Sequence, residues 1–248
     1  MSALTTVLDD ARIYVLGCDL SGQSNMITLE VEAETKDRST FRSGGWKEVT
    51  AGQRKGSIAG GGFADFGPAG TVSTDAWEQL GANDPITISP TESDAGALAF
   101  VTKLQRAKFG TGGKVGDLNE WELSGGSAWP VVRGQYLLSP GTVLTADTAA
   151  AGAELGAVAA GSRLYASMHL VSITGATAEA VVTVESAADS TFTSPTTVIT
   201  FTTATAVTGE ILRTDGSAIT DTWYRAVVDC PDAAGDDSYL IAVAAGIA

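Results

Sequence analysis

Few side chains in this sequence have the types and spacing that catalysis or metal binding requires. The single histidine, His169, lies in the apolar run 164–173, and no GxSxG motif supplies a nucleophile for it. The two cysteines, Cys18 and Cys230, lie far apart and match no zinc-ligand spacing. We therefore expect all three to be buried structural residues, in a reducing compartment.

Two further patterns are similar to ligand sites but lack their full signatures. The segment GTGGKVGD at 110–117 is no P-loop, because Lys108 stands where the first glycine belongs and no Ser or Thr follows the Gly-Lys pair. Asp232, Asp236 and Asp237 cluster without the spacing of a calcium-binding loop. We interpret them as a turn and a solvated loop, and expect no cofactor, no metal and no enzymatic activity.

Composition and charge narrow the possible functional classes of the protein. The chain has 248 residues, of which 44% are hydrophobic and 18% charged, with a net charge of −14. This acidity argues against nucleic-acid binding, which needs Lys and Arg to neutralise phosphates, and favours solubility and repulsion between copies. No run of 18 apolar residues occurs, and residues 1–12 lack the features of a signal peptide. We expect neither a membrane span nor a secretion signal.

We predict that the secondary-structure elements of this chain are mostly β-strands. Thr and Val are abundant, which favours strands. The composition changes near residue 140: residues 1–140 carry 17 acidic and 12 basic side chains, and residues 141–248 carry 12 and 3. We predict two domains, residues 1–140 and 163–248, joined by a linker and edge strand at 141–162.

The first domain is predicted to contain strands and one helix. Ile27, Leu29 and Val31 alternate with polar residues, which indicates a strand with one buried face. A helix is expected over 93–109, because Ser93 can cap its start and an apolar stripe follows at helical spacing. The predicted strands, with a turn at Gly52 between the third and the fourth, are 12–18, 26–32, 46–51, 54–64, 84–89, 117–124 and 129–138.

The second domain has no helical pattern. Short apolar runs separated by Gly and Pro predict an immunoglobulin-like β-sandwich, although the Cys…Trp…Cys pattern of antibody domains is absent. The predicted strands are 163–173, 179–186, 197–203, 207–213, 221–229 and 238–246.

Residues 41–67 favour assembly over catalysis. This segment holds eight glycines, and the aromatic residues Phe41 and Trp46 flank Gly44 and Gly45 near its start. Glycine permits positive φ and close approach of another chain. A glycine-rich arm buries aromatic side chains poorly by itself, so we expect Phe41 and Trp46 to pack at a contact between subunits. The alternative is packing within their own subunit.

The first domain resembles the major tail tube proteins of long-tailed bacteriophages. The resemblance rests on ETKDRSTFRSGGWKEVTAGQRKGSIAGGGFADF at 34–66, SDAGALAFVTKLQRAKFG at 93–110 and VGDLNEWELSGGSAWPVVRGQYL at 115–137. The positions that match the family pattern are Trp46, Lys47, Glu48, Gly52, Gly56, Phe63, Asp65, Arg133 and Gly134.

This resemblance implies a β-sandwich or half-barrel subunit that forms hexameric rings, which stack into a hollow tube for DNA ejection. It implies that the loop at about 33–45 reaches a neighbouring subunit or ring, and that the second domain decorates the outside. The implied partners are further copies of the chain and the tail tip, tail terminator and tape-measure proteins. The implied location is the virion tail, after synthesis in the host bacterial cytoplasm, with no membrane contact and no specific DNA binding.

A tube that passes DNA should not hold phosphates. We therefore expect Glu30 and Glu32, and with them Glu120 and Glu122, to face the lumen and repel the polyanion. The alternative is that these carboxylates face outer solvent or pair between subunits.

Two other functions compete with this interpretation. A binding module for a host surface glycan, such as an adhesion or baseplate component, needs an exposed aromatic platform on the second domain. The aromatic residues available there are Tyr165, Phe192, Phe201, Trp223, Tyr224 and Tyr239. An acidic hydrolase needs a pair of convergent carboxylates, and no pair in the sequence stands out.

Overall fold

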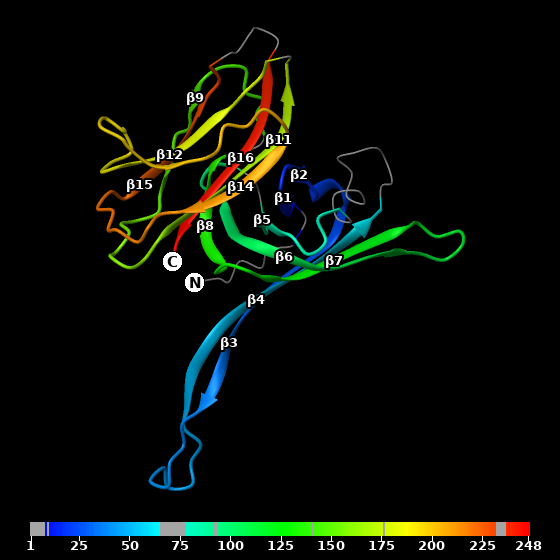
Figure 1. Cartoon of the computed structure of the whole chain (residues 1–248), viewed down its shortest axis with the longest axis vertical. Helices are drawn as coiled ribbons and strands as arrows, with labels where there is room; N and C mark the ends of the chain where they lie inside the picture. The colour runs from blue at the N-terminus through cyan, green and yellow to red at the C-terminus, as the bar shows by residue number, and fades with distance from the viewer. Residues whose placement is uncertain are drawn as a thin grey trace, which may run out of the picture.

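The computed structural model describes the chain in segments that together form an almost entirely antiparallel β protein (Figure 1). The predicted mostly-β fold is confirmed. The described residues are 8, 10–64, 78–91, 94–139, 141–175, 177–231 and 237–248.

Strands follow the alternating segments of the sequence. The first eight are β1 (Arg12–Val15), β2 (Cys18–Asp19), β3 (Ser24–Asp37), β4 (Val49–Phe63), β5 (Asn83–Ser89), β6 (Leu98–Gly112), β7 (Glu120–Ser127) and β8 (Val132–Leu138), with a 3-10 turn at Ser21–Gln23. The others are β9 (Thr148–Ala149), β10 (Ala153–Glu154), β11 (Leu164–Thr174), β12 (Val181–Ala187), β13 (Thr196–Thr200), β14 (Thr208–Arg213), β15 (Trp223–Asp229) and β16 (Ser238–Ile247). All six strands predicted beyond residue 163 are present.

Two sheets contain these strands. The larger has eleven strands in the order β14-β11-β16-β8-β6-β5-β1-β2, with β7 pairing β6, β4 pairing β7, and β3 pairing β4. The smaller has the order β10-β15-β12-β13, and β9 also pairs β15. The region predicted as linker and edge strand thus contributes β9 and β10.

The C-terminal part is a β-sandwich. Alternate residues of β11 and β16, such as Met168 and Val243, face alternate residues of β12 and β15, such as Val184 and Val228, in one buried core. Period-2 alternation produces this arrangement, because each strand sends every second side chain inward. The sandwich architecture matches the prediction, and its immunoglobulin-like character stays a prediction.

The larger sheet runs through the predicted domain boundary. β8 pairs with β16, with Tyr136 opposite Ala244 and Leu138 opposite Val243. The β1–β2 turn also lies against the C-terminal strands: a Cβ on Gly17 would lie 2.3 Å from Val207 Cγ1. The division at 140 stays a prediction, and the two parts share a sheet and a buried cluster that includes Tyr14, Tyr136 and Tyr165.

The predicted helix over 93–109 is wrong. Residues Leu98–Gly112 form β6, a central strand that pairs with β5 on one side and with β7 and β8 on the other. The apolar stripe fits both periods, and pairing on both edges satisfies the backbone groups that a helix would have satisfied internally. The predicted cap, Ser93, lies outside the described residues.

The predicted turn at Gly52 is also wrong. β4 is continuous from Val49 to Phe63, and Gly52 lies in a bulge where the register passes from Ala33–Arg54 to Thr35–Ala51. Two residues of β4 there oppose Glu34 alone. A Cβ on Gly52 would come within 3.2 Å of Glu34, so glycine relieves crowding in the bulge and does not reverse the chain.

Candidate functional site

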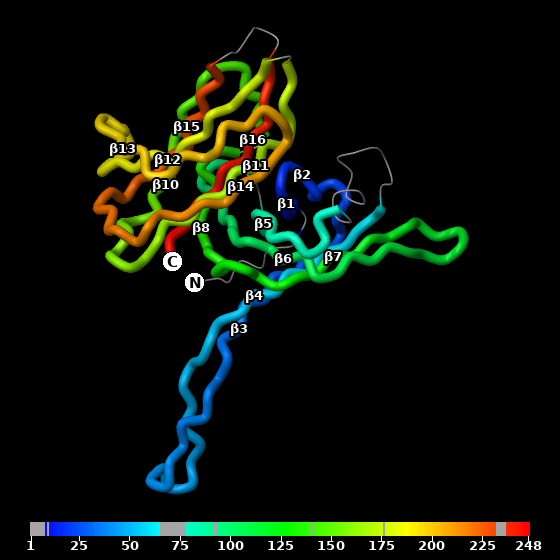
Figure 2. The backbone as a smooth tube through the Cα atoms, in the orientation of Figure 1, coloured from blue at the N-terminus to red at the C-terminus, as the bar shows by residue number. Residues whose placement is uncertain are grey.

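The outer parts of β3 and β4 form an arm that extends from the body as a two-stranded hairpin (Figures 1 and 2). Pairing between the strands continues to Asp37 opposite Val49, whereas β4 pairs with β7 only between Ser57 and Phe63. Beyond that point the arm has no third strand among the described residues. An isolated two-stranded hairpin is at best marginally stable in water, so a surface that covers it would stabilise it.

The tip of the arm, which we define as residues 38–48, is a well-organised turn. The Arg38 amide donates to the Glu48 carbonyl at 2.9 Å, and the Trp46 amide donates to the Ser43 carbonyl at 3.0 Å. Gly44 and Gly45 have φ of 61° and 87°, the left-handed region that favours glycine. All four residues predicted as a subunit contact, Phe41, Gly44, Gly45 and Trp46, therefore lie together at the tip.

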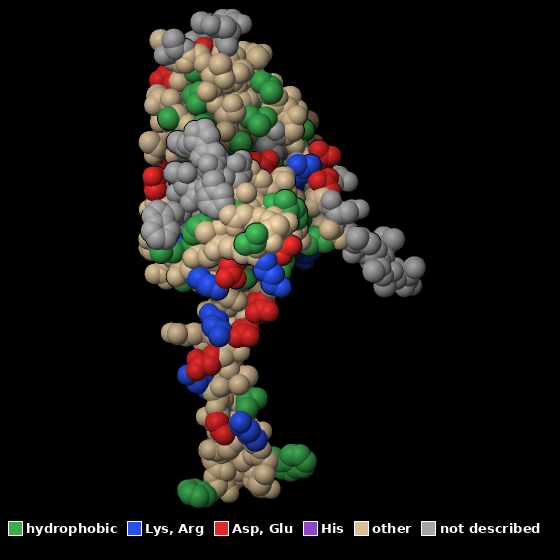
Figure 3. Space-filling model, turned by 90° about the vertical axis from the view of Figure 1, so that its right-hand side faces the viewer, with side chains coloured by type: hydrophobic (Ala, Val, Ile, Leu, Met, Phe, Trp, Pro, Cys, Tyr) green, Lys and Arg blue, Asp and Glu red, His purple; other side chains and the backbone are tan. Residues whose placement is uncertain are grey.

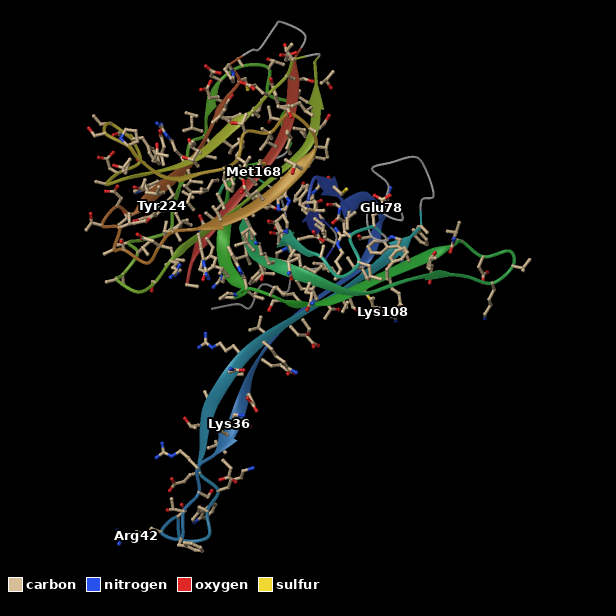
Figure 4. All side chains as sticks on the ribbon, viewed as in Figure 1. Lys36, Arg42, Glu78, Lys108, Met168 and Tyr224 are labelled. Carbon is tan, nitrogen blue, oxygen red and sulfur yellow. The ribbon has the colours of Figure 1, made fainter. Side chains whose placement is uncertain are left out.

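Phe41 and Trp46 are exposed at this tip. Their relative exposures are 111% and 81%, so neither side chain is buried within its own subunit. Hydrophobic side chains stand out from the end of the arm in Figure 3, and Figure 4 labels Arg42 in the loop at the same tip. Aromatic side chains of this size concentrate binding energy when a partner buries them.

Opposite charges alternate along the arm. Lys55 lies 3.0 Å from Glu32, Arg38 lies 3.6 Å from Glu48, and Lys36 pairs with Glu34. These pairs are exposed, and each contributes at most about 1 kcal/mol. The tip itself carries three basic residues (Arg38, Arg42, Lys47) and one acidic residue (Glu48), which gives +2 on a chain of −14.

An apolar groove lies at the base of the arm. Its volume is about 400 Å³, and the described side chains that line it are all apolar: Leu8, Ile27, Leu29, Val31, Ile88, Pro90 and Phe100. It forms because the apolar face of β3 continues past the body: Ile27 and Leu29 pack against the core, whereas Val31 is 55% exposed.

The four predicted lumen carboxylates share one face of a four-stranded region. Glu30 and Glu32 of β3 lie opposite Ser57 and Lys55 of β4. Glu120 and Glu122 of β7 also lie opposite odd-numbered residues of β4, which share one face of that strand. Since alternate residues share a face, the four carboxylates lie on the side away from the core of Trp121 and Leu123. Lys55 and Lys108 partly neutralise this face, Lys108 lying 2.5 Å from Glu122. The sheet places the four together, and the lumen remains a proposal.

A second hairpin, β6–β7, projects in another direction (Figure 2). Its turn contains Lys114–Asp117, closed by the Asp117 amide donating to the Lys114 carbonyl at 3.0 Å. Val115 and Leu118 are exposed there. The glycine-rich segment at 110–117 is therefore a strand end and a hairpin turn: the predicted turn is present, but it follows strand β6 and not a helix.

His169 is a structural residue. Its side chain is fully buried, with Nδ1 2.6 Å from the Leu16 carbonyl and Nε2 2.8 Å from Thr87 Oγ1. The carbonyl can only accept, so Nδ1 carries the proton and Nε2 accepts from Thr87. Desolvation lowers the pKa of His169 to about 4. The histidine thereby ties the β1–β2 turn to β5 and β11.

The other predicted chemical groups show no ligand site. Both cysteines are free; Cys230 is buried, and desolvation with nearby carboxylates raises its pKa to about 11, which suits an inert thiol. Cys18 is only partly buried, so the prediction that both cysteines are buried is wrong for it. Asp232 and Asp236 lie outside the described residues, and Asp237 is buried, so the predicted solvated loop is wrong at that position. Among the residues that are described, no three His, Cys, Asp or Glu side chains group as metal ligands, and no helix is long and apolar enough to cross a membrane.

The aromatic residues of the C-terminal part form no platform for a glycan. Five of the six are buried, and the remaining one, Trp223, is half-buried in β15. The five buried residues are Tyr165, Phe192, Phe201, Tyr224 and Tyr239. This distribution gives the glycan-binding alternative no support.

No family model matches the chain, and no curated protein matches it. Three solved structures are similar to parts or to most of the chain. The chain is similar over 51% of its length to proteins of the virion of a native gene transfer agent particle and of the tail of an empty one, at 20% and 19% identity. Each comparison covers 97% of the other chain, with a TM-score of 0.41. A crystal structure of the SPP1 Dit (gp 19.1) protein is similar over 96% of this chain and 99% of its own, at 11% identity and a TM-score of 0.35.

Sequence reasoning missed the groove. Pro90 and Phe100 contribute to it, and the predicted helix over 93–109 placed Phe100 on the wrong element. Part of the signal was present in Val31, which extends the apolar face of β3 further than the body reaches.

Proposed function

We propose that this chain is a non-enzymatic structural protein of a bacteriophage tail, whose copies assemble into stacked rings that form a hollow tube for DNA. The arm carries the proposal. It is a hairpin without a third strand, it ends in two exposed aromatic residues, and its turn is fully organised. A chain that builds such an element has a surface for association already formed.

The acidic face of β3, β4 and β7 supports a role for the tube interior. Four carboxylates and two lysines give it a net negative charge, which repels a polyanion and lets it slide. We propose that this face lines the lumen. Hexameric symmetry, a two-domain division with an outer immunoglobulin-like domain, and contacts with tail tip, terminator and tape-measure proteins come from the sequence resemblance and belong to the same proposal.

Electron microscopy of the purified protein tests the proposal directly. We expect rings or tubes with an axial channel, and a variant in which residues 40–46 are replaced by a short Gly-Ser turn should remain monomeric yet folded. A wild-type protein that stays monomeric at high concentration, or that forms closed particles without a channel, would contradict the proposed function.

A further inference from the structure

We propose that the apolar groove at the base of the arm receives the arm tip of a second copy of this chain, with Phe41 and Trp46 inserted. The inference rests on the proposed self-assembly and adds the surface that accepts the arm. The groove and the tip hold the exposed apolar side chains that the inference uses: Val31 lines the groove, and Phe41 and Trp46 lie at the tip.

The groove has the size and chemistry of a seat for an aromatic side chain. Its walls come from three strands or their ends: Val31 from β3, Pro90 just after β5, and Phe100 from β6. Among the described residues, no charged or polar side chain lines it. A volume of about 400 Å³ accommodates a large aromatic side chain, and burying such a side chain is the usual core of a strong protein contact.

The tip of the same copy cannot fill this groove. Val31 lies in the groove and Asp37 ends the strand, six residues further along β3, a distance of roughly 20 Å at the rise of an extended strand. Pairing with β4 continues to Asp37 opposite Val49, which keeps the arm extended. An arm tip that fills this groove must therefore come from another molecule.

Charge favours a second copy as that molecule. The tip carries +2, and the rest of the chain carries −16, since the whole chain has −14. No ion pair among the described residues involves Arg42 or Lys47, so both remain available to the acidic body of a neighbour. Opposite charges on tip and body steer the encounter of two copies and disfavour contact between two tips.

Such a contact joins two different surfaces. A tip that enters the groove of the next copy leaves its own groove open for another tip, so copies add head to tail. Head-to-tail contacts close into rings or continue as helical filaments, whereas a self-complementary contact would stop at a dimer. The proposed seat therefore accounts for polymerisation by one repeated contact.

Cross-linking between cysteine variants tests the seat. In a Cys18→Ser background, Lys47→Cys at the tip and Val31→Cys in the groove are purified separately, mixed at assembling concentrations and treated with a short bismaleimide. We expect a covalent dimer only in the mixture, and a ladder of multiples from the double variant. Val143→Cys, at a residue that is 58% exposed and remote in sequence, replaces Val31→Cys as the control and should give neither.

A second measurement separates this inference from the proposed function. Val31→Lys should raise the concentration needed for half-assembly in sedimentation by roughly 30-fold, while Val143→Lys should leave it unchanged. Assembly that survives Val31→Lys and shows no cross-link from Lys47→Cys to Val31→Cys would overturn the groove while the proposed function stands. Wild-type protein that never associates would overturn both.

Discussion

Acid should unfold this protein partly through one histidine. His169 is neutral in the folded protein, where its Nδ1–H donates to the Leu16 carbonyl and its Nε2 accepts from Thr87. Thr87 Oγ1 also lies 2.7 Å from Ser167 Oγ. The folded pKa of His169 is about 4, below the ordinary value of 6.5, because the buried site gives the imidazolium no water. Protons therefore bind the unfolded chain first as the pH falls.

The size of the effect follows from that difference. A folded pKa below the unfolded one means that stability is complete above pH 6.5 and is lost as the pH falls toward 4. The difference between the unfolded and folded pKa values of His169 corresponds to roughly 3 kcal/mol of folding stability. About 2.5 kcal/mol of this stability should be lost between pH 7.5 and 4.5.

Urea unfolding at a series of pH values measures this loss, at protein concentrations too low for association. The His169→Gln variant has no titrating group at this position, so it should be less stable at every pH but lose about 2.5 kcal/mol less than wild type between pH 7.5 and 4.5. All carboxylates are present in both proteins and cancel in the comparison. Equal losses in the two proteins would refute the assignment of a neutral, buried His169.

Three other variants test the proposed assembly surface, the proposed lumen and the core. Trp46→Ala should weaken each contact between copies by about 2 kcal/mol in sedimentation, without changing the thermal midpoint of the monomer, because the side chain is exposed. Glu30→Lys combined with Glu32→Lys should reduce infectivity by impairing DNA passage, while tubes still form, since the pairs on the arm are exposed and change stability by less than about 1 kcal/mol. Asp84→Asn should destabilise folding by about 3–5 kcal/mol in urea unfolding, because it removes the carboxylate 2.6 Å from the buried Arg106 guanidinium.

Each of these predictions has a clear contrary result. Val115→Ala is the control for Trp46, since Val115 is exposed at the other hairpin, and equal effects from both would remove the special role of the arm tip. Normal infectivity of the double lysine variant would end the lumen assignment. Unchanged stability of Asp84→Asn would mean that the ion pair with Arg106 contributes nothing to the fold.

Strands could be predicted where alternation coincided with burial on one side. In the sandwich, Val182 and Val184 on β12, and Ala226 and Val228 on β15, alternate with partly exposed residues of the opposite face, and turn residues separate the strands. β6 could not be predicted in this way, because it is central and buries residues of both faces, such as Val101 and Thr102. A continuous apolar run of this kind has no unique period.

The exposure of Phe41 and Trp46 on a glycine-rich arm could be predicted, because these residue types are unfavourable inside a regular strand of the subunit. Gly44 and Gly45 give up conformational freedom for a left-handed turn, and Phe41 and Trp46 have no strand neighbours that could bury them. The groove could not be predicted, because its other walls come from β5 and β6, and neither of these strands pairs with β3. Phe100 reaches it only through the order of strands in the sheet, and that order is set by pairing over long sequence distances.

Strand β3 carries both apolar residues that pack within the subunit and an apolar residue assigned to the proposed contact between copies. On β3, Ile27 and Leu29 pack against the body and stabilise the subunit, whereas Val31, two positions further, faces the open groove. Beyond it the strand carries small or charged side chains that need no cover, and large apolar groups return only at the tip with Phe41 and Trp46. Because the apolar residues that folding buries and those left exposed are different, the proposed contact with a neighbour would cover area that packing within the subunit does not use.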